Sequence, residues 1–394
     1  MPDNQVTPEI VERDISLDGG RIPELEGLRA VLAWIVVAAH VLICSGWFGP
    51  SMDGISVLSQ VAEAAVDVFM LLSGFAITRL LLVEQEPFKV YLWRRFLRIV
   101  PAYWVALAAA IALNNQLAAN LAHLPATLDR DGMIMVCQLG ASRWWIDIPL
   151  HVALLHGFAP SSLLPWAPYT FLGAAWSLSL EWQFYCVAPF ALMLAMWNRV
   201  AAVLLISVAA ISTAFAGPIM SAFSDAFLPA KIAFFVVGGI SYFAVCRMRA
   251  RGMSMVTLAV PILILALIWW RTSGRLIEAI ISGGIWVLVV GSVRLEQLRA
   301  LREFLNCRLM QYLGRVSYST YLFHAPVITL VQAAIWRWFS PHSMAALIIG
   351  TFVSATAGTL LVSAMSWRFI EAPFQKVGRR GGAMRSRSRI HGAS

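Results

Sequence analysis

Long apolar runs recur along the whole chain and alternate with short polar segments. A helix of about 20 apolar residues crosses the hydrocarbon core of a bilayer, so runs of roughly 17–25 residues predict membrane-spanning helices. Such runs lie at residues 28–48, 61–83, 99–121, 173–197, 200–217, 230–246, 254–270, 276–293, 314–338 and 344–366. The pattern therefore predicts an all-α integral membrane protein, a bundle of about ten transmembrane helices.

Two kinds of segment depart from this pattern. Residues 1–20 are polar, with five acidic residues against one arginine, which predicts a flexible tail and no signal peptide. The run Ile148–Phe158 is too short to cross a bilayer, so we expect a re-entrant or interfacial segment within the loop 122–172. The expected organisation is a tail at 1–20, a ten-span domain at 21–374 and a basic tail at 375–394.

Composition and charge support a membrane protein and predict its orientation. Hydrophobic residues make up 59% of the chain and charged residues 13%, about half the share of a soluble domain. Cytoplasmic loops collect Lys and Arg, and a cytoplasmic N-terminus places 24 of the 30 basic residues on the inner side. The six on the outer side would be Arg130, Arg143, Lys231, Arg271, Arg275 and Arg337. We therefore expect both termini in the cytoplasm, a multi-pass protein of the inner (plasma) membrane, and no nucleic-acid binding.

The spacing of the cysteines and of one histidine pair bears on whether the chain has a disulfide or a metal site. Five cysteines are widely scattered without a Cys-x-x-Cys spacing, which favours free thiols buried as small hydrophobic groups. A Cys44–Cys137 disulfide stays possible if both thiols face an oxidising compartment. His151 and His156 are five residues apart and would not share a helix face, so the sequence predicts no metal site.

Ionisable residues inside a membrane are costly and usually functional. Arg29 and His40 are eleven residues apart in the first apolar run, which puts both on one helix face about 16 Å apart. Counting residues from the outer helix ends puts His40, Asp67 and Glu181 at a common depth of about 9–12 Å. The common depth predicts an acid/base cluster, although the two carboxylates could instead be structural counter-ions. His324 falls near mid-membrane.

Basic and aromatic residues alternate where the chain enters the third apolar run. Lys89, Arg94, Arg95 and Arg98 lie among Tyr91, Trp93 and Phe96. Such a loop can be positive for topology alone, or it can bind phosphate groups, which arginine pairs bidentately. The residues themselves leave both interpretations open.

Six blocks of sequence, in order over most of the chain, resemble the membrane-bound acyltransferase 3 family of O-antigen and exopolysaccharide O-acetylases. The blocks are Pro23–Arg29 with His40, Val66–Phe75, Tyr91–Trp104, Trp176–Tyr185, Gly314–His324 and Arg368–Phe374. The resemblance implies that His40 is catalytic, that Arg95 and Arg98 engage the acyl donor, and that Glu181 is the acidic residue of its block. Ser73, Trp176 and His324, inside the same blocks, are further candidates.

Three positions depart from the family pattern. Glu26 and Ala30 stand where Asp and Gly are usual, and Trp182 stands where a second Glu is common, so no role is expected for that second carboxylate. Some members carry a soluble esterase-like domain after the last span. The Arg-, Gly- and Ser-rich residues 367–394 predict only a short tail in its place.

The sequence thus predicts a membrane O-acyltransferase with acyl-CoA, most simply acetyl-CoA, as co-substrate and no tightly bound cofactor or metal. The expected acceptor is a hydroxyl of a glycan or lipid-linked saccharide near the outer face. Arg29, Arg95 and Arg98 would bind the donor, and His40 with Glu181 or Asp67 would act on the acceptor. A transporter or flippase of lipid-linked sugars is the main alternative, because it would also need polar groups in the membrane. A non-catalytic membrane scaffold is a third.

Overall fold

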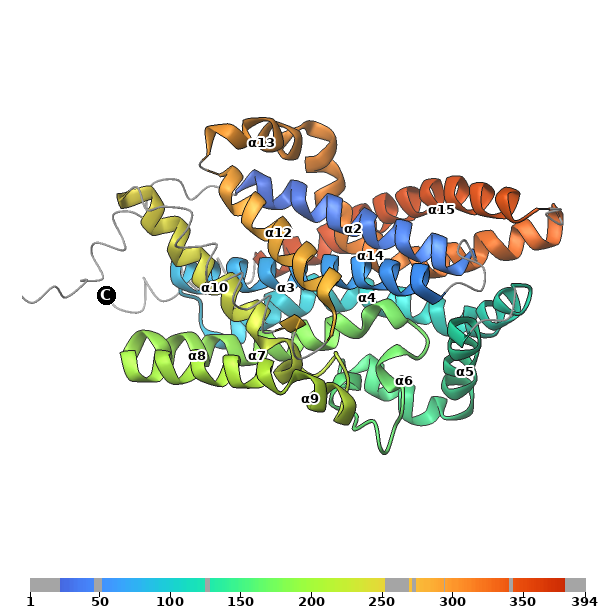
Figure 1. The fold of residues 1–394 in the computed structure, drawn as a ribbon, viewed down its shortest axis with the longest axis horizontal. Helices are drawn as coiled ribbons and strands as arrows, with labels where there is room; N and C mark the ends of the chain where they lie inside the picture. The colour runs from blue at the N-terminus through green and yellow to red at the C-terminus, as the bar shows by residue number, and fades with distance from the viewer. Residues whose placement is uncertain are drawn as a thin grey trace, which may run out of the picture.

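The computed structural model describes residues 22–45, 52–124, 128–251, 269–270, 274–293, 295–339 and 343–379. All regular secondary structure in these residues is helical (Figure 1). Six helices are long and apolar enough to cross a membrane, or eight if each of two bent helix pairs counts as one span. The six candidate spans coincide for most of their length with α2 (Pro23–Cys44), α3 (Met52–Glu84), α4 (Phe88–Ala122), α7 (Trp176–Trp197), α10 (Leu228–Arg251) and α15 (Met344–Ser366). The all-helical, multi-pass prediction is confirmed.

Of the remaining predicted spans, two lie in bent helix pairs and one lies almost entirely outside the described residues. Run 200–217 forms the bent pair α8 (Arg199–Ala214) and α9 (Ala216–Ala222), and run 276–293 forms α12 (Leu276–Ser292), which is followed by α13 (Arg299–Asn306). Run 254–270 lies outside the described residues except for its last two, and so do the predicted tail 1–20 and residues 380–394. The total of ten spans therefore stays a prediction.

Run 314–338 lies in α14 (Arg308–Trp338), the helix around which α2, α4 and α15 pack (Figure 1). α14 is not among the six apolar helices, because it buries many polar groups, including Ser319, Thr320 and His324. Its neighbours shield these groups from lipid, so α14 is an internal helix of the bundle rather than a lipid-facing one.

α2 and α14 run in the same direction and touch at both ends. Gln311 Nε2 donates to the Pro23 carbonyl at 2.7 Å near the start of each helix, and Gln332 Nε2 donates to the Cys44 carbonyl at 2.8 Å near the end. A Cβ on Gly314 would lie 2.1 Å from the Glu26 carbonyl oxygen. Only glycine permits this close approach, which explains why the two matching sequence blocks meet here.

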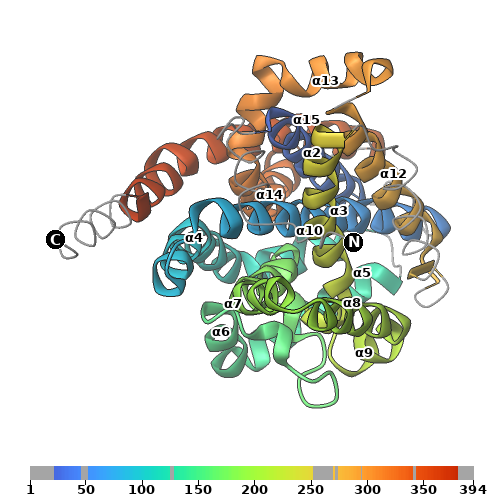
Figure 2. The ribbon, with the colours of Figure 1, turned by 90° about the vertical axis from the view of Figure 1, so that its left-hand side faces the viewer.

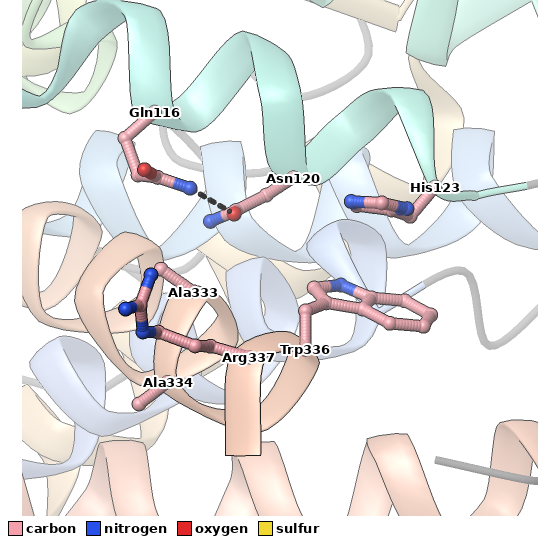
Figure 3. A pocket seen from close by; sticks show the side chains of 7 residues that line it. All are labelled: Gln116, Asn120, His123, Ala333, Ala334, Trp336 and Arg337. Atoms are coloured by element: carbon pink, nitrogen blue, oxygen red, sulfur yellow. Dashed lines mark hydrogen bonds between the residues drawn. The ribbon is translucent and has the colours of Figure 1, made fainter. Parts of the chain in front are cut away.

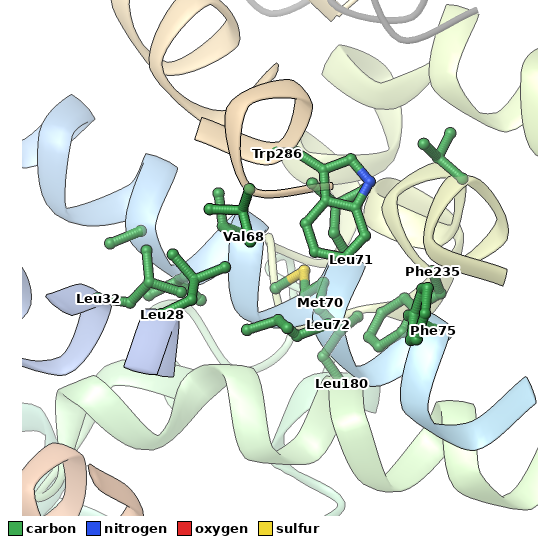
Figure 4. Close-up of a cluster of buried hydrophobic side chains, with 14 of the residues drawn as sticks. Leu28, Leu32, Val68, Met70, Leu71, Leu72, Phe75, Leu180, Phe235 and Trp286 are labelled. Carbon is green, nitrogen blue, oxygen red and sulfur yellow. The ribbon is translucent and has the colours of Figure 1, made fainter. Parts of the chain in front are cut away.

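α3, α10 and α12 form the other side of the bundle, and their packing is largely apolar. A cluster of buried side chains joins them to α2 and α7, as Figure 4 shows. Its members include Leu28, Leu32, Val68, Met70, Leu71, Leu72, Phe75, Leu180, Phe235 and Trp286. Gly74 lets α3 approach α10, since a Cβ there would lie 2.0 Å from the Phe235 carbonyl oxygen. This tight packing fixes α3, which carries candidate residues on two of its sides.

The loop 122–172 folds into α5 (Leu128–Ser142), α6 (Trp144–Val152), η1 (His156–Phe158) and η2 (Ala167–Tyr169), followed by η3 (Gly173–Ala175) before α7. Figure 2 shows α6 beneath α4 and α7. Tyr103 and Trp104 of α4 hold α6 through hydrogen bonds to the His151 and Val152 carbonyls, at 2.9 and 3.0 Å. The expected re-entrant or interfacial segment is thus a short helix and a 3-10 turn packed on the bundle.

His151 and His156 are close together, contrary to the expectation from their spacing. Their rings stack with centroids 4.3 Å apart. Helix α6 ends at Val152, and Leu154 has a left-handed backbone with φ 58°, so the chain turns back before His156. Burial, with the neighbouring His151 ring, holds the pKa of His156 well below its usual value, and burial also lowers the pKa of His151.

Residues 375–379 of the predicted tail 375–394 are helical, and a Cβ on Gly378 would contact Arg94 and Leu97 of α4. The tail itself stays a prediction. All five cysteines are free thiols, but the expectation that they are buried holds only for Cys137. Cys44, Cys186 and Cys246 are partly exposed, and Cys307, between α13 and α14, is exposed.

Candidate active site

Two histidines from distant parts of the sequence meet inside the bundle. His40 lies on α2 and His324 on α14, with ring centroids 4.9 Å apart and the planes tilted by 60°. His324 is fully buried and His40 is partly exposed. The parallel packing of α2 on α14 brings them together, so His324 is the titratable partner that the structure gives to His40.

The backbone fixes which nitrogen of each ring carries the hydrogen. His40 Nδ1 lies 2.9 Å from the Val36 carbonyl oxygen, and His324 Nδ1 lies 2.7 Å from that of Tyr321. A carbonyl oxygen only accepts hydrogen bonds, so in each neutral ring Nδ1 carries the hydrogen and Nε2 is the acceptor. Both imidazoles therefore have an Nε2 lone pair with which to take a proton.

Three arginines form a second group toward the start of α2, which we call the arginine layer: Arg29 on α2, and Arg95 and Arg98 on α4. All three are partly buried. None makes an ion pair with a carboxylate among the residues that the structure describes, and Arg95 Nε has no hydrogen-bond partner there. By contrast, Arg94 next to them pairs with Glu84 at 2.6 Å and with Glu86. Within the described part of the chain, the layer therefore holds positive charge without an ion-pair partner.

Glu181 lies nearer the arginine layer than the histidines. Its Oε1 accepts hydrogen bonds from Ser73 Oγ at 2.9 Å and from the Tyr185 hydroxyl. The Arg95 guanidinium lies over the Tyr185 ring, 5.9 Å from its centroid, and Arg29 experiences the Glu181 charge. Ser73, a candidate from its sequence block, is thus a direct partner of Glu181.

Asp67 lies on another side of α3, in what we call the lysine cluster: Lys231, Asp67 and Glu278. Lys231 Nζ donates to Asp67 Oδ1 at 2.6 Å and to Glu278 Oε1 at 2.9 Å, and all three side chains are fully buried. Trp269 covers the ammonium with its ring centroid at 4.7 Å, and Trp176 lies at 5.7 Å. Trp176 therefore contacts this cluster rather than the arginines.

The expected cluster of His40, Asp67 and Glu181 is not formed. Among the described residues, neither carboxylate hydrogen-bonds to either imidazole, because each is held by other partners. Equal depth in the membrane says nothing about the direction in which a side chain leaves its helix. Asp67 faces α10 and α12, Glu181 faces α3 near the arginine layer, and His40 faces α14.

A domain model of acyltransferases matches residues 22–368, most of the chain and every residue discussed above. The chain belongs to the acyltransferase 3 family. It is 24% identical over 390 residues to the peptidoglycan O-acetyltransferase OatA of Listeria monocytogenes serovar 1/2a, covering 91% of this chain and 56% of that protein. It is 22% identical over 396 residues to O-acetyltransferase OatA of Staphylococcus aureus strain NCTC 8325, covering 91% and 58%.

This acyltransferase thus spans just over half the length of the curated relatives that it matches. No solved structure matches it. The matched region contains both the histidine pair and the arginine layer, and these groups come from α2, α4 and α14, far apart in sequence.

Three buried charged residues near the candidate site are not among the residues predicted from sequence: Lys231, Glu278 and Glu371. The charge pattern places Lys231 on the outer side, and its position at the start of the run 230–246 is a signal of burial. Glu371 ends the π-helical turn η5 (Trp367–Glu371) and accepts a hydrogen bond from Ser319. It is 3% exposed and within electrostatic range of Arg98 and Arg29. Its place in the last matched block was the signal that could have identified it.

Proposed function

We propose that this chain is a membrane O-acyltransferase that moves an acyl group, most simply acetyl, from cytoplasmic acyl-CoA to a hydroxyl of a glycan or glycolipid at the outer face of the inner membrane. One observation carries the proposal: α2 connects a group of unpaired arginines to a histidine pair. Arg29 and His40 are separated by about 16 Å of helix. Such a separation suits a donor with phosphates at one end and a reactive thioester at the other.

The arginine layer suits the phosphate end of acyl-CoA. Arg29, Arg95 and Arg98 come from two helices and make no ion pairs among the described residues, so an anionic ligand would supply the missing counter-charge. Arginine binds phosphate oxygens through two parallel hydrogen bonds, and such charge-assisted bonds are strong. The extended pantetheine arm would then run along α2 and α14 toward the histidines.

At the other end, His40 would act as a general base. Its Nε2 takes the proton of the acceptor hydroxyl as that oxygen attacks the thioester carbonyl. The new bond joins the acceptor oxygen to the acyl carbon, the carbon–sulfur bond breaks, and the proton passes from Nε2 to the departing thiolate. His324 would stabilise the transient imidazolium through its own unprotonated Nε2, which has no partner among the described residues.

The acceptor and the orientation belong to the same proposal. A listerial relative is named a peptidoglycan O-acetyltransferase, which supports a glycan acceptor. The excess of basic residues in alternate loops supports a cytoplasmic N-terminus, ten spans and the arginine layer near the cytoplasm.

Transfer by the purified protein in liposomes tests the proposal directly. Wild-type protein given labelled acetyl-CoA and an extracted cell-surface polysaccharide should form labelled ester. His40→Ala should reduce turnover by about 10²–10⁴-fold, the usual contribution of a general base. Trp197→Ala, a change of an exposed ring at the end of α7, is the control and should leave turnover unchanged. Normal turnover by folded His40→Ala protein would refute the assignment, and sugar movement without ester formation would favour a transporter.

A further inference from the structure

A pocket of 610 Å³ lies between the end of α4 and the end of α14, beyond His324 along α14. Figure 3 shows its lining: Gln116, Asn120 and His123 from α4, and Trp336 and Arg337 from α14, with two alanines. Four of these side chains are polar, and polar groups facing lipid without partners are costly. The pocket therefore opens to water at one end of the bundle.

The pocket is joined structurally to the site below it. Asn120 Nδ2 donates to the Thr329 carbonyl at 2.8 Å, and Thr329 is five residues from His324 on α14. His324 and Ala333 are nine residues apart, a rise of about 14 Å along α14. A ligand of more than one sugar unit could thus occupy the pocket and extend toward His40 and His324.

The side chains offer three kinds of contact that together fit a saccharide. His123 and Trp336 stack with centroids 4.7 Å apart, forming an aromatic platform for a sugar ring. Gln116 Nε2 donates to Asn120 Oδ1 at 2.8 Å, which leaves the Gln116 carbonyl oxygen and a second N–H for hydroxyl groups. Arg337 extends toward α4 in Figure 3 and has no carboxylate within 4 Å among the described residues.

We propose that this pocket is the acceptor-binding subsite and that it takes a saccharide bearing a carboxylate, with a sugar ring on Trp336 and the carboxylate on Arg337. The inference rests on the proposed function, because it supplies the acceptor for the transfer at His40. A carboxylate is favoured over a neutral sugar because Arg337 otherwise has no counter-ion in the described structure. The separation of the pocket from His324 further implies that oligosaccharides are better acceptors than single sugars.

Two sugars that differ only in the carboxylate give a sharp binding test. Methyl β-D-glucuronide and methyl β-D-glucoside are titrated by ligand-observed NMR against the protein in phosphatidylcholine nanodiscs, without acyl donor. The glucuronide should bind about tenfold more tightly or better, the usual gain from a charge-assisted hydrogen bond. Arg337→Gln should remove this difference, and Trp336→Leu should weaken both sugars.

Two matched variants on the same helix serve as controls. Tyr312→Leu removes an exposed aromatic ring and Arg315→Gln removes an arginine, both near the opposite end of α14 and outside the pocket lining. Both should bind the two sugars as wild type does. Equal binding of the two sugars by wild-type protein, or unchanged binding by the Arg337 and Trp336 variants, would overturn the proposal. If neither sugar binds and the nanodisc lipid occupies the pocket instead, the pocket is a lipid site and the saccharide proposal is wrong.

The same preparations separate this inference from the proposed function. In the transfer assay, Arg337→Gln should raise the acceptor KM about tenfold and leave the donor KM unchanged. Transfer with an unchanged acceptor KM would refute the pocket while the acyltransferase function stands. Arg337-dependent sugar binding by a wild-type protein that transfers no acyl group would refute the function while the pocket stands.

Discussion

The lysine cluster and the arginine layer are two groups of charges inside one helical bundle, and they are treated in opposite ways. Lys231 lies between two carboxylates at 2.6 and 2.9 Å, with no exposed surface. The three arginines have no ion-pair partner among the described residues. Both groups lie beside α3. Asp67 of α3 belongs to the lysine cluster, and Ser73 of α3 donates a hydrogen bond to Glu181 near the arginine layer.

This difference in pairing suggests a structural role for the lysine cluster and a ligand-binding role for the arginine layer. Charges removed from water need partners, and breaking a buried pair leaves an uncompensated charge. In the lysine cluster the ammonium is paired with a carboxylate on either side, and these contacts join α3, α10 and α12. The arginine layer has no such pairing among the described residues, and we propose that its role is to bind an anion. The following variants test that division, from the largest expected effect to the smallest.

The largest effect should come from Lys231→Met, which keeps the volume of the side chain but leaves Asp67 buried without its cation. Glu278 would keep only Arg275, at 3.4 Å, as a cationic partner among the described residues. Removing one partner of a buried pair costs about 3–5 kcal/mol, so the yield of folded protein and its melting temperature in detergent should fall sharply. Arg299→Met is the matched control, because the Arg299–Glu303 pair is largely exposed and such pairs contribute little. A Lys231→Met protein as stable as wild type but unable to bind donor would reverse the comparison.

An intermediate effect is expected from Arg98→Gln, and it should appear in binding rather than in stability. Loss of a charge-assisted phosphate contact should weaken CoA binding by about 1.5–3 kcal/mol, measured by calorimetry, with the melting temperature nearly unchanged. Arg94→Gln is the control, since Arg94 is already paired with Glu84 and Glu86. Equal losses in the two variants would mean that the whole loop acts only through its positive charge.

The smallest effect is a pH dependence of stability. It comes from a third kind of buried titratable group, one that stays uncharged instead of being paired. The pKa of His156 is well below its usual value because the ring is buried beside His151. The unfolded chain therefore takes up protons as the pH falls below about 6.5 while the folded ring does not, so stability is complete above that pH and declines below it. The decline should be at most roughly 1.4 kcal/mol per pH unit for each histidine.

Thermal unfolding between pH 7.5 and pH 5.5 measures this dependence. His156→Phe keeps a planar ring in the stack and removes one titrating group, so its melting temperature should fall less steeply with acid than that of wild type. The nearby Arg143–Asp147 pair, at 2.8 Å, is unchanged in the variant and provides a constant background. An identical pH dependence in the two proteins would show that His156 is not the group responsible.

Much of the molecule could be predicted from sequence, because helical periodicity works well within one helix. Arg29 and His40 were placed on one face of one helix, and α2 places the first in the arginine layer and the second against His324. Between helices the same arithmetic was insufficient. Depth along the membrane placed Asp67 beside His40, but the side chain faces Lys231, because the azimuth of each helix depends on tertiary packing.

Irregular backbone explains most of the remaining differences. The left-handed turn at Leu154 brings His151 and His156 together, and the π-helical turn at 367–371 places Glu371 near Arg98. Neither turn leaves a periodic pattern of hydrophobic residues from which it could be predicted. The polar α14 also departs from the rule that spans are apolar, since its neighbours cover its Ser, Thr and His side chains.

The pairing of α2 with α14 has a consequence for how the protein is made. His324 follows His40 by 284 residues, so at about 5–20 residues per second the ribosome needs roughly 15–60 s to supply the second histidine. Throughout that interval the nascent α2 is in the membrane without α14, the helix that Gly314 allows to approach it so closely. Lipid, a chaperone or other early helices must cover this surface until α14 is inserted. Any premature stop before that helix yields a membrane protein whose reactive centre was never assembled.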